Sequence, residues 1–292
     1  MNVSVELVFD YKCTLGEGPT WDHKRNLFYW VDILQHKLYR YNSTDQEVDV
    51  AVFDQPIGCV VPRESGDVVV ALQNGFFFYD WERDELDPIE DPEHHLPKNR
   101  FNDGKCDPKG RFWAGTTDEY GVDGNGALYV LEQDLSVMKK VGNVGTSNGL
   151  AWSLDNQYMY FIDTPTKQVV RYNFDLESGA IDQPKTVIEF PEHCGFPDGM
   201  TIDQEGMLWI AGWSGYGVSR WNPYTGEQLD FIPVPAKNVT SCAFGGEDLS
   251  DLYITTARTG TSDEELEQYP HAGGVFRVET NVKGSRNFRF EG

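Results

Sequence analysis

Four residues that can offer an oxygen atom to a metal ion stand at matching places in the chain, each directly before a glycine. They are Glu17, Asp103, Asn148 and Asp198, three carboxylic acids and one amide. All-oxygen ligand sets suit Ca²⁺, Mg²⁺ and Mn²⁺, and carboxylates also accept Zn²⁺. If the fold gathers these side chains, their charges repel and lose hydration, and a bound divalent cation removes both penalties. We therefore expect a divalent-metal site, although Asp and Asn also precede glycine in ordinary turns and bulges.

The four residues recur because the chain is built from copies of one unit. Each copy has the glycine step, an apolar pair, a turn rich in Asp, Gly and Asn, and then a strongly β-forming run. The β-forming runs are Phe28–Asp32, Val68–Leu72, Phe112–Ala114, Met159–Ile162, Leu208–Ala211 and Leu252–Thr255. Their spacing of about 40 to 49 residues is the period of propeller blades with four strands each. The repeat therefore predicts an all-β chain with six blades.

We expect the six blades to form a single domain over residues 1–292, a closed six-bladed β-propeller, with a sandwich or barrel as the alternative. The N-terminal strand Val3–Leu7 would complete the last blade, because a closed ring must hide its free edges. The acidic run Asp263–Glu267 is expected to be a solvated loop. Equivalent positions of the repeats would form a ring around the central channel. These positions are Glu17, Ile57, Asp103, Asn148, Asp198 and Thr240.

The composition limits the partners. The 292 residues contain 24 Lys and Arg against 47 Asp and Glu, a net charge of −23. So acidic a surface repels phosphate backbones and anionic lipid headgroups, and neither nucleic acid nor membrane is expected as a partner. The N-terminus lacks the basic start of a signal peptide, and no apolar run approaches the roughly 20 residues that span a bilayer, so we expect a cytoplasmic protein. The five cysteines form no CxxC pair, and no GxSxG elbow of a serine esterase is present.

Four motifs carry a resemblance to a known family: LGEGPTWD from Leu15, RFNDGKCDPKGRFWAGT from Arg100, SNGLAWS from Ser147 and FPDGMTID from Phe196. Together they resemble the SMP-30/gluconolactonase family over nearly the whole chain. The resemblance implies a six-bladed propeller that binds one divalent metal in its channel and hydrolyses sugar lactones. It also implies metal ligation by Glu17, Asn148 and Asp198, contact of Arg100 and Asn102 with sugar hydroxyls, and a place beside the metal for Asp103.

The sequence departs from the vertebrate members of this family directly after Gly115 and Thr116. Those proteins have a methionine followed by two successive acids, whereas Asp118, Glu119 and Tyr120 follow Thr117 here. Tyr120 stands where the second acid would contact substrate, so the lactone can differ from theirs. We expect Glu119 and Tyr120 on the substrate-binding rim.

The expected activity is metal-dependent opening of an aldonolactone to the aldonic acid. The metal (Ca²⁺, Zn²⁺, Mg²⁺ or Mn²⁺) would act as Lewis acid. Asp198 is the first candidate for the general base, because the resemblance gives it that role beside metal ligation, and Asp103 is the second. Two other functions stay open: a metal-dependent phosphotriesterase-like hydrolase on the same fold, and a non-catalytic propeller that binds Ca²⁺ or another protein. The particular lactone and the oligomeric state are also open.

Overall fold

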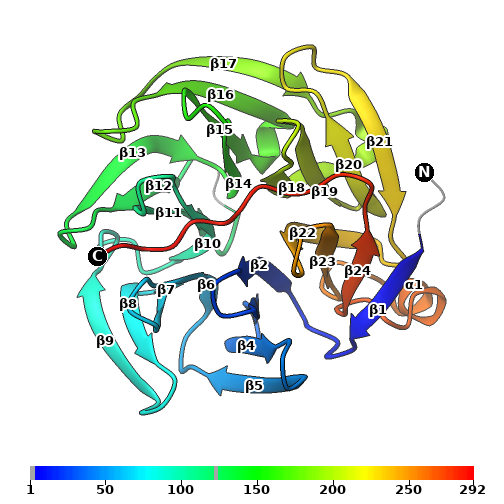
Figure 1. The fold of residues 1–292 in the computed structure, drawn as a ribbon, viewed down its shortest axis with the longest axis horizontal. Helices are drawn as coiled ribbons and strands as arrows, with labels where there is room; N and C mark the ends of the chain where they lie inside the picture. Colours follow the sequence, from blue (N-terminus) through cyan, green and yellow to red (C-terminus); the bar gives the residue numbers. More distant parts are fainter. Residues whose placement is uncertain (1–3, 122–123) are drawn as a thin grey trace.

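The computed structural model describes residues 4–121 and 124–292, whose strands form six four-stranded antiparallel sheets set radially around a central axis (Figure 1). From the axis outwards, the first sheet is β2 (Gly16–Asp22), β3 (Leu27–Asp32), β4 (Lys37–Asn42) and β5 (Glu47–Val52). The second is β6 (Ile57–Pro62), β7 (Val68–Leu72), β8 (Gly75–Asp80) and β9 (Glu85–Glu90). The third is β10 (Asn99–Cys106), β11 (Phe112–Asp118), β12 (Gly126–Leu131) and β13 (Val137–Val144). The next two are β14 (Ser147–Trp152), β15 (Tyr158–Asp163), β16 (Gln168–Phe174) and β17 (Ile181–Glu189); and β18 (Phe196–Ile202), β19 (Leu208–Trp213), β20 (Gly217–Trp221) and β21 (Gln228–Pro233). The sixth is β22 (Asn238–Gly245), β23 (Asp251–Ala257), β24 (Val275–Glu279) and β1 (Val5–Phe9). The predicted single-domain six-bladed β-propeller is confirmed.

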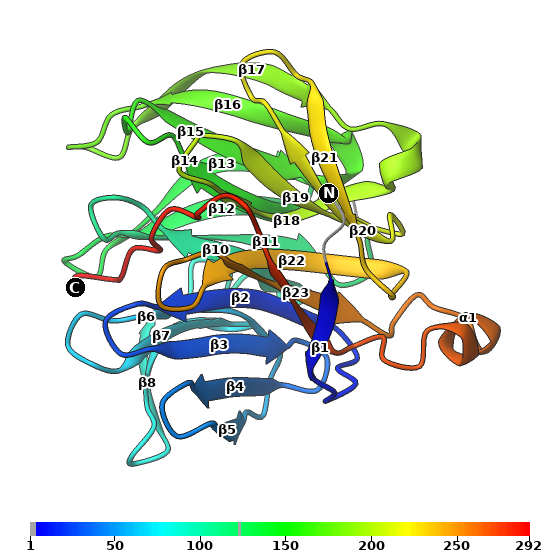
Figure 2. The ribbon, with the colours of Figure 1, turned by 45° about the vertical axis from the view of Figure 1, so that its right-hand side comes forward.

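The ring closes through its N-terminal strand. β1 pairs antiparallel with β24, with Val5 opposite Val278 and Leu7 opposite Phe276, so the first strand of the chain is the outermost strand of the last blade (Figure 2). The predicted closure is confirmed, although the strand begins later than expected, and Val3 lies outside the described residues. Because strands from the two ends of the chain share one sheet, the first and last blades are tied together and the ring is closed.

Each inner strand carries one extra residue near the channel. In β14, for example, Ser147 pairs with Asp163 and Leu150 pairs with Phe161, so Asn148 and its glycine neighbour form a β-bulge. Similar register shifts interrupt β2, β6, β10, β18 and β22. Such bulges bend a strand and re-aim a side chain. The glycine of the step also permits close blade packing: a Cβ on Gly149 would lie 2.9 Å from the Asp198 carbonyl oxygen of the next blade.

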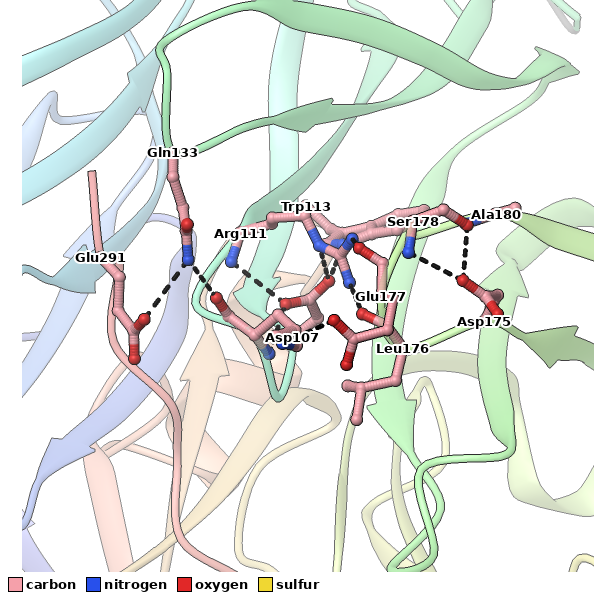
Figure 3. Close-up of polar contacts among 11 residues, drawn as sticks. Asp107, Arg111, Trp113, Gln133, Asp175, Leu176, Glu177, Ser178, Ala180 and Glu291 are labelled. Carbon is pink, nitrogen blue, oxygen red and sulfur yellow. Dashed lines mark hydrogen bonds and ion pairs between the residues drawn. The ribbon is translucent and has the colours of Figure 1, made fainter.

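Buried aspartates fix the turns that follow the inner strands, as Figure 3 shows for the third blade. Asp107 Oδ2 accepts hydrogen bonds from Arg111 Nε at 2.6 Å and from Trp113 Nε1 at 2.9 Å, and all three side chains are buried. Asp203 has the same arrangement in the fifth blade, where Trp209 Nε1 donates at 2.9 Å. A buried carboxylate with several donors holds the turn rigidly, because every donor loses its partner if the turn moves.

The C-terminal segment crosses one mouth of the channel, as the red trace in Figure 1 shows. Its Phe290 side chain is fully buried, Arg289 forms a buried ion pair with Asp22, and the Phe290 amide donates to Pro62 O at 2.9 Å. Asp22 and Pro62 are the last residues of their inner strands. Two water-sized cavities, of about 10 and 20 Å³, are lined in part by this segment. It therefore covers the mouth at the C-terminal ends of the inner strands.

The expectation of a loop at Asp263–Glu267 was wrong. Helix α1 spans Asp263–Gln268, and its first turn is held by a capping box: Ser262 Oγ accepts from the Glu265 amide, and Glu265 accepts from the Ser262 amide at 2.9 Å. The S-x-x-E spacing and three acids in the first turn favour a helix start, and the charge pattern alone does not express this. Two short 3-10 helices, η1 (Thr164–Thr166) and η2 (Glu192–Cys194), complete the elements. Among the described residues no helix is both long and apolar enough to cross a membrane.

Candidate functional site

A pocket of about 400 Å³ opens at the N-terminal ends of the inner strands, away from the ends that the C-terminal segment covers. Inner strands β2, β10, β14 and β18 supply most of its polar side chains, and the turn η1 after β15 contributes one edge. Its lining is Leu15, Glu17, Arg100, Asn102, Thr146, Asn148, Thr164, Pro165, Phe196, Asp198 and Trp213. The pocket therefore contains five of the residues predicted from the sequence, on four different blades.

Glu17 and Asp198 form a buried pair of carboxyl groups in the wall of this pocket. They are 4% and 5% exposed, and they lie close enough to share a hydrogen bond. Burial raises the pKa of both groups, and their mutual repulsion with the nearby Asp103 carboxylate raises the pKa of Asp198 further. Asp198 Oδ1 is buried without a hydrogen-bond partner. A buried acceptor without a hydrogen-bond partner is able to bind a proton or a cation.

The amide of Asn148 completes this group, and hydrogen bonds fix the orientation of the amide. Asn148 Nδ2 donates to Thr164 Oγ1 at 2.8 Å, and that hydroxyl donates in turn to Pro197 O at 2.8 Å. Because Nδ2 is held there, Asn148 Oδ1 faces the other way, where it accepts from Asn102 Nδ2 at 3.1 Å. Sequence reasoning missed Thr164, which lies on η1 outside the aligned positions of the repeat.

The donor set fits a divalent cation. Two buried carboxylates and one amide oxygen are ligands that Ca²⁺, Mg²⁺ and Mn²⁺ accept, and the unpartnered Asp198 Oδ1 is free to coordinate. In the part of the chain that the structure describes, no three His, Cys, Asp or Glu side chains form a metal-binding group. The Asn148 amide oxygen is available as a third protein ligand for a cation held by Glu17 and Asp198.

Arg100 and Asn102 lie beside this group on β10. Arg100 Nη1 donates to Asn102 Oδ1 at 2.7 Å and to Phe101 O at 3.0 Å, and Asn102 Nδ2 donates to Ser147 O at 2.9 Å. Burial lowers the pKa of the Arg100 guanidinium, and the charges of Glu119, Glu17 and Asp198 oppose that shift. The remaining guanidinium N–H groups can bind hydroxyl or carbonyl oxygens of a ligand in the pocket.

Asp103 lies deeper in the channel than the sequence alignment suggests. In β10, Phe101 is the last paired residue before the bulge, and Asn102 follows it. Asn102 therefore has the same place in the register as Asn148 and Asp198 in their strands. Asp103 is one residue further along the chain. Asp103 instead lines a small lower cavity with Lys105, whose ammonium donates to Met200 O at 2.7 Å. Its carboxylate accepts from the Gly104 amide at 2.7 Å.

Glu119 and Tyr120 are not among the residues that line the pocket. Glu119 is exposed, and its charge raises the pKa of Arg100 against the effect of burial. Tyr120 is 74% exposed, and the Lys98 ammonium lies 5.1 Å from the centre of its ring. Contact of these two residues with substrate stays a prediction.

The pocket lining also includes four apolar residues, which sequence reasoning missed. We call Leu15, Pro165, Phe196 and Trp213 the apolar wall. A signal for part of it was present, because residues two apart on a strand share a face. Leu15 precedes Glu17 by two residues and Phe196 precedes Asp198 by two, just as Arg100 precedes Asn102.

The fold and the pocket together define a class of protein. It is a six-bladed propeller with two buried carboxyl groups, an oriented amide and an arginine–asparagine pair at one mouth of its channel. The chain belongs to the SMP-30/gluconolactonase/LRE-like family, whose model matches residues 15–258. The family expected from the four sequence motifs is thereby confirmed.

Individual relatives match the chain over almost its full length. The Bacillus subtilis (strain 168) protein named "Putative sugar lactone lactonase YvrE" is 40% identical over 283 residues, 97% of each chain. Regucalcin of Danio rerio is 39% identical over 294 residues, 100% of this chain and 99% of that protein. The solved structure of a calcium-binding protein, regucalcin, from Agrobacterium tumefaciens strain C58 has a TM-score of 0.94 at 27% identity, covering 99% of this chain and 97% of that one.

Proposed function

We propose that the protein hydrolyses a sugar lactone to the corresponding acid with a divalent cation held by Glu17, Asn148 and Asp198. The observation that carries the proposal is the pocket itself, where two buried carboxyl groups and an oriented amide oxygen adjoin the Arg100–Asn102 pair. The names of the relatives support it: one is named as a sugar lactone lactonase, and another is described as calcium-binding. Ca²⁺ is therefore the first cation to test.

In the proposed reaction, water adds to the carbonyl carbon of the lactone and the ring C–O bond breaks, which leaves a carboxylic acid and a hydroxyl group on one open chain. A divalent cation held by Glu17, Asn148 and Asp198 would polarise the carbonyl and stabilise the charge that develops on its oxygen. Asp198 takes one proton from the attacking water and then gives it to the leaving ring oxygen, which regenerates the carboxylate. Asp103 is the second candidate for this base, deeper in the channel.

Arg100 and Asn102 would orient the substrate. The guanidinium donates charge-assisted hydrogen bonds to ring hydroxyls, and its bond to Asn102 keeps both side chains in one arrangement. Holding the lactone in a single orientation raises the rate of hydrolysis, because the entropic cost of aligning the carbonyl carbon with the water is then already met by binding. Glu119 and Tyr120 would contact the far end of the substrate from the rim.

One observation favours a second candidate, a metal-dependent phosphotriester hydrolase. Such an enzyme would use the same cation and base but would take an apolar substrate, and the apolar wall offers a surface for one. The Arg100–Asn102 pair favours a substrate with hydroxyl groups, so we place the lactone first.

The test is a pH-indicator assay of metal-free protein supplied with Ca²⁺, Mg²⁺, Mn²⁺ or Zn²⁺, because opening a lactone releases a proton. Substrates are hexonolactones, pentonolactones and one aryl phosphotriester. We expect lactone turnover with at least one cation in wild-type protein and in Glu177→Gln, an exposed control, but not in Glu17→Gln. Full turnover of metal-free wild-type protein, or turnover of the triester alone, would refute the proposal.

A further inference from the structure

The apolar wall gives the pocket a surface that cannot form hydrogen bonds with hydroxyl groups. Phe196 is 39% exposed, Leu15 and Trp213 are half-buried, and Pro165 is exposed, so four apolar side chains face the pocket and remain open to water. Water at such a surface is released when an apolar group of a ligand covers it, and this release favours binding. An apolar part of a ligand would therefore gain free energy from contact with this wall.

The polar groups next to the wall already have protein partners. Thr164 Oγ1 accepts from Asn148 and donates to Pro197 O, and Thr146 Oγ1 lies 3.2 Å from Thr117 Oγ1. The Lys167 ammonium lies 4.2 Å from the centre of the Phe196 ring and pairs with an exposed glutamate at 2.8 Å. A second sugar unit seated here would find few free donors or acceptors for its hydroxyl groups, which disfavours it.

The pocket is also larger than one sugar ring requires. Its volume of about 400 Å³ is in the range of sites that enclose drug-sized ligands. A lactone ring placed at Asp198, with its hydroxyls at Arg100 and Asn102, would use the polar residues of the lining. The apolar wall would remain for another part of the substrate.

We propose, on the basis of the sugar-lactone function above, that the substrate is a hydroxylated lactone bearing an apolar substituent, and that Leu15, Pro165, Phe196 and Trp213 bind that substituent. The proposal makes the apolar wall a specificity determinant. One methylene in an apolar pocket changes kcat/KM by about 10-fold or more, so a whole apolar substituent should contribute at least about 10-fold.

The test compares three lactones on the metal-loaded wild-type protein: a hexono-1,4-lactone, its 6-O-benzyl ether, and a disaccharide lactone with a second sugar at the same oxygen. We expect kcat/KM for the benzyl ether to exceed both others by at least about 10-fold. In Phe196→Ala and Trp213→Ala this preference should fall towards one. The matched control is Phe231→Ala, 38% exposed on the outermost strand β21, which should keep the wild-type preference.

Binding of the matched lactams, which resist hydrolysis, separates this proposal from the proposed function. Calorimetry should give tighter binding of the benzyl-bearing lactam than of the bare one in wild-type protein, and equal binding in Phe196→Ala. If no lactone is hydrolysed but this binding difference is found, the lactonase function fails and the apolar subsite stands. If the bare or disaccharide lactone is the better substrate and the lactams bind equally, the apolar subsite is refuted while the lactonase function stands.

Discussion

Replacing Thr164 with valine should weaken divalent-metal binding without changing any side chain proposed to coordinate the metal. Valine has nearly the shape of threonine but lacks the hydroxyl that accepts from Asn148 Nδ2 at 2.8 Å and donates to Pro197 O at 2.8 Å. Because Asn148 is only 3% exposed, the abandoned Nδ2 group cannot turn to bulk water. The amide can recover a partner only by rotating, which moves Oδ1 away from the carboxyl pair.

The size of the effect follows from these contacts. Leaving one buried donor unsatisfied costs about 1–3 kcal/mol, and loss of a group that orients a metal ligand weakens metal affinity by about 10–100-fold. Since a tenfold change in affinity is about 1.4 kcal/mol, the two ranges agree. We therefore expect the metal Kd of Thr164→Val to rise by about 10–100-fold.

Calorimetric titration of metal-free protein with Ca²⁺ measures this directly, and urea unfolding of the same samples reports their stability. Thr166→Val is the matched control, because Thr166 is an exposed hydroxyl two residues along η1 that donates to Asp163 O and does not touch Asn148. Equal metal affinity in Thr164→Val, Thr166→Val and wild-type protein would refute the role of Thr164 and the orientation argument for Asn148.

Three further predictions concern other parts of the molecule. Arg111→Met should lower the free energy of unfolding in urea by about 3–5 kcal/mol, because the substitution leaves the buried Asp107 carboxylate without its cation. Lys109→Ala breaks an exposed ion pair and should change the free energy of unfolding by at most about 1 kcal/mol. Equal effects of the two substitutions would contradict this prediction. Burial raises the pKa of the Cys13 thiol to about 12. The folded protein therefore keeps a proton that the unfolded chain releases near pH 8.5. The free energy of unfolding should fall from about pH 8.5 towards pH 12, by about 2 kcal/mol at pH 10. A wild-type pH profile parallel to that of Cys13→Ala would show that this thiol is not responsible. Asn102→Ala should chiefly raise KM for the lactone, by about 10-fold, in steady-state kinetics; an unchanged KM and an unchanged lactone preference would remove Asn102 from the substrate site.

The fold could be predicted because the sequence repeats the same strand pattern in every blade. The β-forming run Val68–Leu72 coincides with strand β7, and Leu208–Ala211 lies within β19. Closure by the N-terminal strand followed from the need to cover a free edge. The short helix after Ser262 was missed because its capping box involves only a few residues, too few for a helical period to be visible.

The site could be predicted only as far as the repeat describes it. Alignment on the glycine step found Glu17, Asn148 and Asp198, which line the pocket, but placed Asp103 with them. In β10 the bulge lies between Phe101 and Gly104, and spacing along the chain does not tell which of its two inner residues faces the pocket. Thr164 and the wall residues Pro165 and Trp213 come from other elements, so only the three-dimensional arrangement brings them to the pocket.

The central claim is that Asp198 both holds a divalent cation and serves the hydrolysis of a sugar lactone. It is tested most directly by measuring Ca²⁺ binding and lactone turnover on the same samples of wild-type and Asp198→Asn protein. We expect wild-type turnover to rise in proportion to bound metal, and we expect Asp198→Asn, folded by circular dichroism, to show neither tight metal binding nor turnover. Wild-type rates in Asp198→Asn, or turnover in wild-type protein that is independent of bound metal, would contradict it.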